Sequence, residues 1–314
     1  MRVFRYPTRR LPALALCLLA GCERARRAPA TETAGASTAP LPTTTAGPAT
    51  LGWVATAGPV LLVAGDTPDG GAMVFPDYPD STLDDSARFD LAPYRSMVVD
   101  LFARSGAVGQ ATVHPTSAPA HESDCASWPL ATLTTPAGSP PAWTVALEHG
   151  HATAIPLDSI DVLSPADSAR LVAEVARIAS TLPGDSSGTF RGLPFVVRSV
   201  RRFTAAPGVQ ALFADIRRKL NEEARPREEQ ILLVAERDSG SAAGPYRAAY
   251  FERTSGLEET IESTDVLAAL ALGTPPHAML VLGRDYGDGT SYSLLERTGP
   301  RQWRIRWTSA YAGC

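Results

Sequence analysis

The chain has 314 residues, of which 29 are basic and 33 are acidic, so its formal net charge at pH 7 is −4. This balance argues against nucleic acid as a partner, because attraction to a phosphate backbone needs an excess of positive charge. The sequence also holds no phosphate-binding loop, no dinucleotide-binding fingerprint and no Cys-x-x-Cys pair.

The N-terminal segment has the layout of a secretory signal peptide. Four arginines lie within the first ten residues, and an apolar run follows over residues 11–20. At about 1.5 Å per residue, this run is too short to cross about 30 Å of hydrocarbon, so a spanning helix is not expected. A positive segment, a short apolar run and small residues before a boundary are typical of a cleaved signal.

Residues 18–22 read Leu-Leu-Ala-Gly-Cys. They resemble the lipobox of bacterial lipoproteins, and the resemblance covers residues 1–22 only. It implies that residues 1–21 are removed as a signal peptide and that Cys22 becomes the lipid-carrying first residue. The implied location is the cell envelope, with the protein anchored to a membrane and facing the periplasm or the cell exterior. The alternative is a secreted protein cleaved within residues 28–30.

Two cysteines remain for the body of the protein once Cys17 has left with the signal and Cys22 is acylated. They are Cys125 and Cys314. An exported chain folds in an oxidising compartment, so we expect these two residues to form a disulfide bond. Two free thiols are the alternative.

Composition divides the mature chain into a linker and a body. Residues 22–50 are rich in Thr, Ala and Pro without an apolar period, which predicts a disordered linker. Residues 51–314 are predicted to form a β-rich globular body of the mainly-β α+β class, with antiparallel β-meander sheets and one clear helix. It could also divide into two lobes, 51–160 and 190–314, around that helix.

The first strands are expected where apolar runs end at Gly, Pro or Asp turns. These runs cover 53–64, 96–103, 108–113, 128–134, 143–148 and 151–156. A helix is then predicted over 164–182. Ser164 can cap it, Pro165 suits its first turn, and apolar residues recur at helical spacing until Pro183.

Strands are expected again at 193–203, 231–236 and 246–253, but residues 208–224 fit two structures. Their apolar residues fall on one helical stripe, whereas the neighbouring meander favours a strand. Four more strands are predicted at 265–272, 277–283, 290–297 and 301–308, forming one antiparallel sheet of the size of a propeller blade. Weak similarity between 231–237 and 291–297 raises the option of blade-like repeats.

Two segments contain metal-ligand residue types. Asp285 and Asp288 lie in a glycine-rich loop that could hold Ca²⁺, although an Asp-Gly hairpin turn explains the same residues. His149 and His151 would share one strand face and could bind Zn²⁺. A third ligand would have to come from His114, His121, Glu122 or Glu148, and the alternative is a polar turn.

Two basic clusters lie near the middle of the chain. They comprise Arg198, Arg201 and Arg202, followed by Arg217, Arg218 and Lys219. In an acidic body we expect such residues to pair with carboxylates on neighbouring elements, namely Glu222, Glu223, Glu228 and Glu229. A site for an acidic ligand is the alternative.

The sequence therefore predicts a non-enzymatic, lipid-anchored binding or structural module of the cell envelope, without a cofactor. Its expected partners are the membrane, through the lipid, and a protein or envelope polymer. Two alternatives remain open. One is a metal-dependent hydrolase with dispersed His and Asp residues, and the other is a scaffold stabilised by Ca²⁺ at Asp285 and Asp288.

Overall fold

The structure is a computed structural model. It describes residues 53–54, 58–75, 91–116, 127–184, 188–221, 225–238, 244–259 and 261–313, which all belong to one compact unit. The predicted signal peptide, Cys22, the linker, Cys125 and Cys314 lie outside these ranges. So do four of the candidate partner residues, His121, Glu122, Glu222 and Glu223.

Six short strands form a closed barrel in the order β3-β4-β7-β6-β5-β8. They are β3 (Leu61–Ala64), β4 (Gly70–Val74), β5 (Val98–Ala103), β6 (Gly106–Thr116), β7 (Leu130–Thr134) and β8 (Val145–Glu148). A short pair, β1 (Trp53–Val54) and β2 (Gly58–Pro59), precedes the barrel, and the 3-10 turn η3 (Ala92–Tyr94) leads into β5. The β5–β6 hairpin was predicted, whereas the closure of the barrel was not.

A six-stranded antiparallel sheet follows the order β18-β17-β16-β15-β9, with β19 paired to β17. Its strands are β9 (Ala152–Ile155), β15 (Ser263–Leu272), β16 (His277–Asp285), β17 (Gly289–Gly299), β18 (Gln302–Thr308) and β19 (Ala312–Gly313). The predicted C-terminal four-stranded meander is confirmed. Strand β9, from the first half of the chain, pairs with β15 and extends this sheet.

The second sheet has five strands in the order β10-β11-β12-β13-β14. They are β10 (Asp158–Ser159), β11 (Val196–Ala206), β12 (Val209–Leu220), β13 (Arg227–Asp238) and β14 (Arg247–Leu257). The ambiguous segment 208–224 is therefore a strand over β12. Phe213 lies in the apolar core on one face of this strand and Leu212 in the core on the other.

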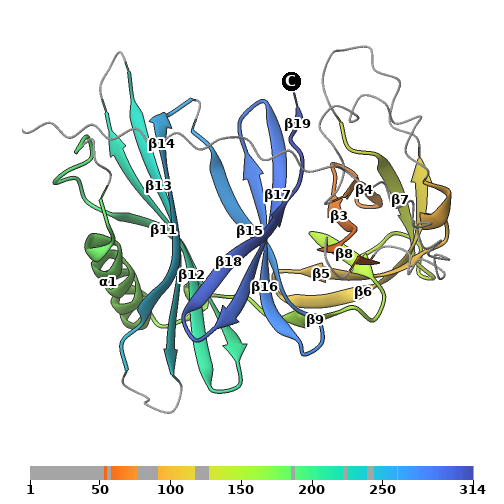
Figure 1. The fold of residues 1–314 in the computed structure, drawn as a ribbon, viewed down its shortest axis with the longest axis horizontal. Helices are drawn as coiled ribbons and strands as arrows, with labels where there is room; N and C mark the ends of the chain where they lie inside the picture. The colour runs from red at the N-terminus through yellow and green to blue at the C-terminus, as the bar shows by residue number, and fades with distance from the viewer. Residues whose placement is uncertain are drawn as a thin grey trace, which may run out of the picture. The chain divides into compact units, whose positions relative to one another are not determined.

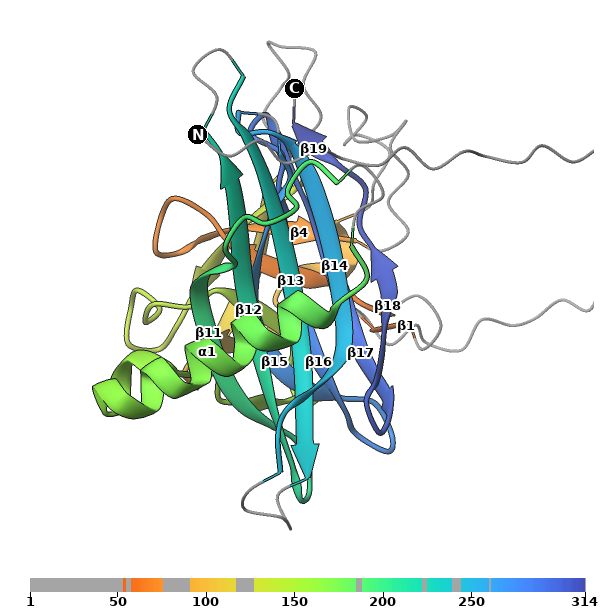
Figure 2. The same ribbon diagram turned by 90° about the vertical axis from the view of Figure 1, so that its left-hand side faces the viewer.

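The helix α1 (Pro165–Thr181) begins where the sequence predicts, after the 3-10 turn η4 (Ile160–Val162). The Ser164 hydroxyl accepts the Asp167 backbone N–H at 3.2 Å, as expected of an N-cap, and Pro165 takes the first turn. Figure 2 shows α1 lying across the strands of the five-stranded sheet. None of the helices in the described ranges is long and apolar enough to span a bilayer.

Three apolar clusters hold these elements together as layers (Figure 1). One is shared by the barrel and the six-stranded sheet, the second fills the space between the two open sheets, and the third packs α1 against the five-stranded sheet. The five-stranded sheet is thus buried on both faces along its middle strands. The expected mainly-β α+β class, with antiparallel sheets and one α-helix in the described residues, is confirmed.

Candidate functional site

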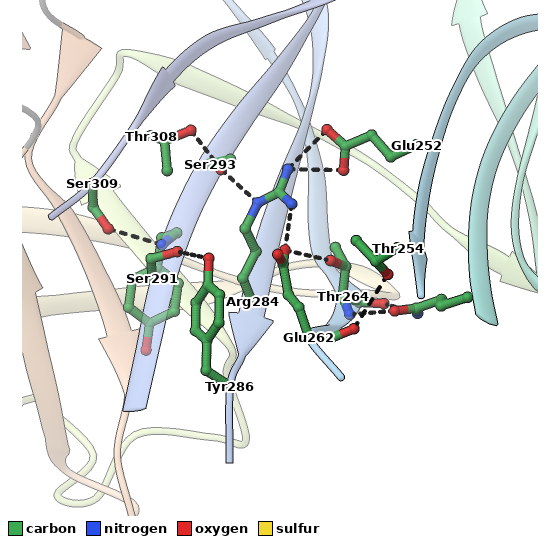
Figure 3. Close-up of polar contacts among 12 residues, drawn as sticks. Glu252, Thr254, Glu262, Thr264, Arg284, Tyr286, Ser291, Ser293, Thr308 and Ser309 are labelled. Atoms are coloured by element: carbon green, nitrogen blue, oxygen red, sulfur yellow. Dashed lines mark hydrogen bonds and ion pairs between the residues drawn. The ribbon is translucent and has the colours of Figure 1, made fainter. Parts of the chain in front are cut away.

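A polar network lies between the two open sheets and centres on Arg284 of β16 (Figure 3). Its Nη2 donates to both carboxylate oxygens of Glu252 at 2.9 Å, and its Nη1 donates to Glu262 Oε1 at 2.6 Å. Burial opposes the charged form of Arg284, but the hydrogen bonds to the two glutamates outweigh it and raise the pKa of Arg284. The charge of Arg284 is therefore neutralised within the fold, and its pair with Glu252 of β14 joins one sheet to the other.

The second basic cluster is also neutralised by carboxylates. Arg217 Nη1 donates to Glu228 at 2.6 Å, and Arg218 Nε donates to Glu229 at 2.5 Å. Lys219 Nζ lies 2.8 Å from Glu228 Oε2. The predicted pairing with Glu228 and Glu229 is confirmed for this cluster, whose residues have a structural role. In the described part of the chain, the first cluster, Arg198, Arg201 and Arg202, forms no ion pair with these glutamates, so the prediction is wrong there.

Glu236 of β13 makes a third buried connection. Arg297 and the Trp303 indole donate to its Oε1 at 2.8 Å and 2.7 Å, and the Arg301 backbone N–H donates to Oε2 at 2.9 Å. Burial alone would raise the pKa of Glu236, but these donors together lower it below its ordinary value. In each of these three groups a buried charge has a partner of opposite sign.

A cavity of about 620 Å³ beside α1 contains arginines that lack such a partner among the described residues. We call it the helix-side cavity. It is lined from η4, α1 and the five-stranded sheet by Leu163, Asp167, Arg170, Leu171, Glu174, Arg202, Arg237, Gly244 and Pro245. A space of this size falls within the range of small-molecule sites, and its lining is rich in charged side chains.

Arg202 of β11 and Arg237 of β13 both project from the helix-facing side of the sheet. Arg202 lies opposite Leu212 in the ladder, and Arg237 lies two residues beyond Ala235, and both of these neighbours belong to the core beneath α1. The two arginines are half-buried. Neither forms an ion pair with any residue that the structure describes, and the buried Nε–H of Arg202 has no acceptor.

Tyr246, the residue after Pro245 of the cavity wall, contacts both Arg237 and Glu174. Its ring is fully buried and packs against Arg237, whose Cζ lies 4.5 Å from the ring centroid. Its backbone N–H donates to Glu174 Oε1 at 2.8 Å. Burial raises the pKa of the Tyr246 hydroxyl, against the opposing effect of Arg237 and Arg202, so this phenol stays neutral at pH 7.

The acidic residues of the cavity do not neutralise these arginines. Asp167 pairs with Arg170 at 2.7 Å and accepts the Ser164 hydroxyl at 2.8 Å. Glu174 lies farther than an ion-pair distance from both arginines, although all three line the same space. With Asp167 and Arg170 cancelling, the cavity carries two positive charges and one negative charge.

The structure places the two candidate zinc ligands in the turn between β8 and β9, each beside a different carboxylate. His149 Nδ1 lies 2.8 Å from Asp100 Oδ1, and His151 Nε2 lies 3.4 Å from Glu148 Oε2. His114, a proposed third ligand, contacts Thr134 on β7 instead. The described residues contain no group of three or more His, Cys, Asp or Glu side chains placed to hold a metal ion.

Asp285 and Asp288 lie at the turn between β16 and β17. Asp285 Oδ1 accepts the Gly287 backbone N–H at 2.8 Å, and Asp288 Oδ1 accepts the Tyr311 hydroxyl at 2.6 Å. Gly287 has a φ of +84°, which a tight turn requires and glycine allows. The structure thus gives each carboxylate its own local partner within the hairpin.

Sequence reasoning identified Arg202 only as part of a basic cluster and did not identify Arg237, Glu174 or Tyr246 as site residues. The option of an acidic-ligand site was the one signal that pointed toward this region. Comparisons of the chain with protein-family models, with curated proteins and with solved structures found no match.

Proposed function

We propose that this protein is a lipid-anchored binding module of the cell envelope that captures an acidic group in the helix-side cavity. The observation that carries the proposal is the pair Arg202 and Arg237, two half-buried cations that share a cavity without a carboxylate partner among the described residues. Carboxylates and phosphates are the acidic groups that guanidinium binds best, and small molecules, envelope polymers and proteins all carry them.

The lack of an internal partner for Arg202 supports this proposal. Its buried Nε–H has no acceptor among the described residues, which costs about 1–3 kcal/mol, so the fold itself does not satisfy this guanidinium group. The contrast with Arg284, Arg218 and Arg297 is informative, because the side chain of each is at most 13% exposed and has a carboxylate partner within the fold. Arg202 and Arg237 line the cavity without such a partner among the described residues, and a bound ligand would supply it.

In this proposal, the membrane anchor holds the helix-side cavity in the cell envelope. A lipid on Cys22 and the linker 22–50 would present the body beside the membrane, with the cavity open to solutes of the envelope. The body as a whole is acidic, so the cavity would be a local positive region that selects by contact geometry and not by long-range attraction.

Isothermal titration calorimetry with glutarate and inorganic phosphate tests the proposal. We expect one molecule of at least one probe to bind per chain. Arg202→Gln and Arg237→Gln should each weaken binding about tenfold or more, because losing a hydrogen bond to a charged group costs about 1.5–3 kcal/mol.

Arg198→Gln is the matched control, since it removes the same charge from an exposed position on the same strand. It should leave the affinity unchanged. The proposal fails if neither probe binds at millimolar concentration, or if all three variants weaken binding equally.

A further inference from the structure

We infer that the ligand of the helix-side cavity is an acidic amino acid, that is, a molecule with two carboxylates and one ammonium group. The inference rests on the proposed function and concerns Glu174, which the capture of a simple anion does not require. A half-buried carboxylate beside an anion site would repel the ligand unless the ligand also brings a positive charge.

Glu174 has bonding capacity left for such a group. Its Oε1 accepts the Tyr246 backbone N–H at 2.8 Å, which fixes the carboxylate in position, while Oε2 has no partner among the described residues. An ammonium group is a triple donor and would bind this oxygen directly. A simple dicarboxylate such as glutarate has no donor to offer it.

The separation of charges within the cavity points to the same ligand class. Arg202 and Arg237 come from two strands and Glu174 from the helix, and among the described residues no ion pair joins the glutamate to either arginine. If opposite charges were only structural, contact between them would be favourable. A bound molecule that carries both signs would bridge the gap between them.

Charge balance then selects among molecules that carry both signs. The two arginines and Glu174 leave the cavity with a net charge of +1, which an amino acid with two carboxylates neutralises at pH 7. An ω-amino acid with a single carboxylate would leave one arginine without a partner. The cavity volume of about 620 Å³ is large enough for an amino acid of this kind.

Calorimetric titration of the wild-type protein with L-glutamate, glutarate and 4-aminobutyrate tests the inference. Glutarate lacks the ammonium group, and 4-aminobutyrate lacks the second carboxylate. We expect glutamate to bind about tenfold more tightly than glutarate, and 4-aminobutyrate to bind more weakly than either.

Glu174→Gln should remove the preference for glutamate and leave glutarate binding equal or tighter. Glutamine retains an oxygen that can accept the Tyr246 N–H, so the variant keeps the local hydrogen bond. Glu259→Gln is the control, because it removes the same charge from an exposed turn after β14 that does not line the cavity, and it should retain the preference.

The outcomes separate this inference from the proposed function. If glutarate binds as tightly as glutamate to the wild-type protein, the inference is wrong and the anion site stands. If none of the three molecules binds and phosphate does not bind either, both are wrong. The wild-type comparison decides the matter even if the Glu174 variant does not fold.

Discussion

The guanidinium group of Arg237 lies over the ring of Tyr246, with Cζ 4.5 Å from the ring centroid, and the backbone N–H of the same tyrosine holds Glu174 at 2.8 Å. One residue thus positions a cation and an anion of the helix-side cavity. It does so through two different groups, the ring and the backbone, which substitutions can separate.

The first prediction tests the role of the Tyr246 ring, because substitutions change the side chain and leave the backbone N–H in place. Tyr246→Phe should keep the affinity for glutarate, because the aromatic face under Arg237 remains. Tyr246→Leu should weaken binding by about twofold to tenfold, since a cation–π contact contributes about 0.5–1 kcal/mol at exposed sites and more when desolvated. Calorimetry on both variants checks this, after circular dichroism has established that each is folded. Equal affinities in the two variants would show that the ring does not position Arg237.

The fold was predictable where local signals agree with tertiary packing. The Ser164 cap, Pro165 and the apolar spacing all predict α1, and the structure places the helix at Pro165–Thr181. The C-terminal meander has clear turns, so its four strands were predicted in the right order.

Strand β12 was not predictable in the same way. It is buried against the six-stranded sheet through Phe213 and against α1 through Leu212 and Ile216, so its apolar residues do not alternate with polar ones. In a strand buried on both faces, apolar and polar residues no longer alternate. The spacing of its apolar residues can then match that of a helix. The closed barrel escaped prediction because ring closure depends on the β3–β8 pairing, which joins distant segments.

The candidate site was predictable only in part. Arg202 belongs to a visible basic cluster, but the sequence does not tell which of its arginines would find a carboxylate. Glu174, Arg237 and Tyr246 lie on a helix, on a strand and before another strand, and only the packing of α1 on the sheet brings them together. The spacing of these residues along the sequence does not predict that arrangement.

The second prediction concerns the start of α1. Ser164→Ala removes the hydroxyl that accepts the Asp167 N–H at 3.2 Å, and it should lower the free energy of unfolding by about 1 kcal/mol. Ser164→Thr should restore most of this loss, because threonine keeps both the capping oxygen and the hydroxyl that donates to Asp167. Urea unfolding at pH 7 measures both changes. A Ser164→Ala variant as stable as the wild-type protein would contradict the capping role.

The third prediction is an acid dependence of stability. The pKa of Glu236 is lower in the folded protein than its ordinary value of 4.5, so the folded state favours the ionised carboxylate. Its contribution to stability is complete above about pH 4.5 and is lost as the pH falls through the lower, folded-state pKa. Glu236→Gln should therefore lower the stability at pH 7 and flatten its decline below pH 4.5.

Chemical unfolding of both proteins at pH 7 and at several lower pH values tests this. Removing one partner of a buried ion pair costs about 3–5 kcal/mol, so the loss at pH 7 should be large. Glu259→Gln, at an exposed position in the turn after β14, serves as the control and should change little. If the wild-type and Glu236→Gln curves run parallel into acid, Glu236 does not carry the acid dependence.

The fourth prediction concerns the two cysteines of the body, which lie outside the described residues. We expect Cys125 and Cys314 to be joined, so the unfolded, unreduced protein should show no thiol that reacts with maleimide when Cys22 is acylated. Reduction should expose two thiols and lower the free energy of unfolding by as much as about 5 kcal/mol, the value for closure of a loop this long. Two reactive thiols before reduction would contradict the disulfide.

The fifth prediction concerns the anchor. A bacterial expression host supplied with labelled palmitate should incorporate the label into the wild-type protein and not into Cys22→Ala, because an acyl chain needs the sulfur of that residue. The variant should move from the membrane fraction to the soluble fraction, since the body has no other predicted anchor. Cys17→Ala is the matched control, because that cysteine lies within the segment that we expect to be cleaved, and its loss should leave labelling and fractionation unchanged. A Cys22→Ala protein that remains with the membrane as fully as the wild type would show that the lipobox resemblance does not describe how this chain is held.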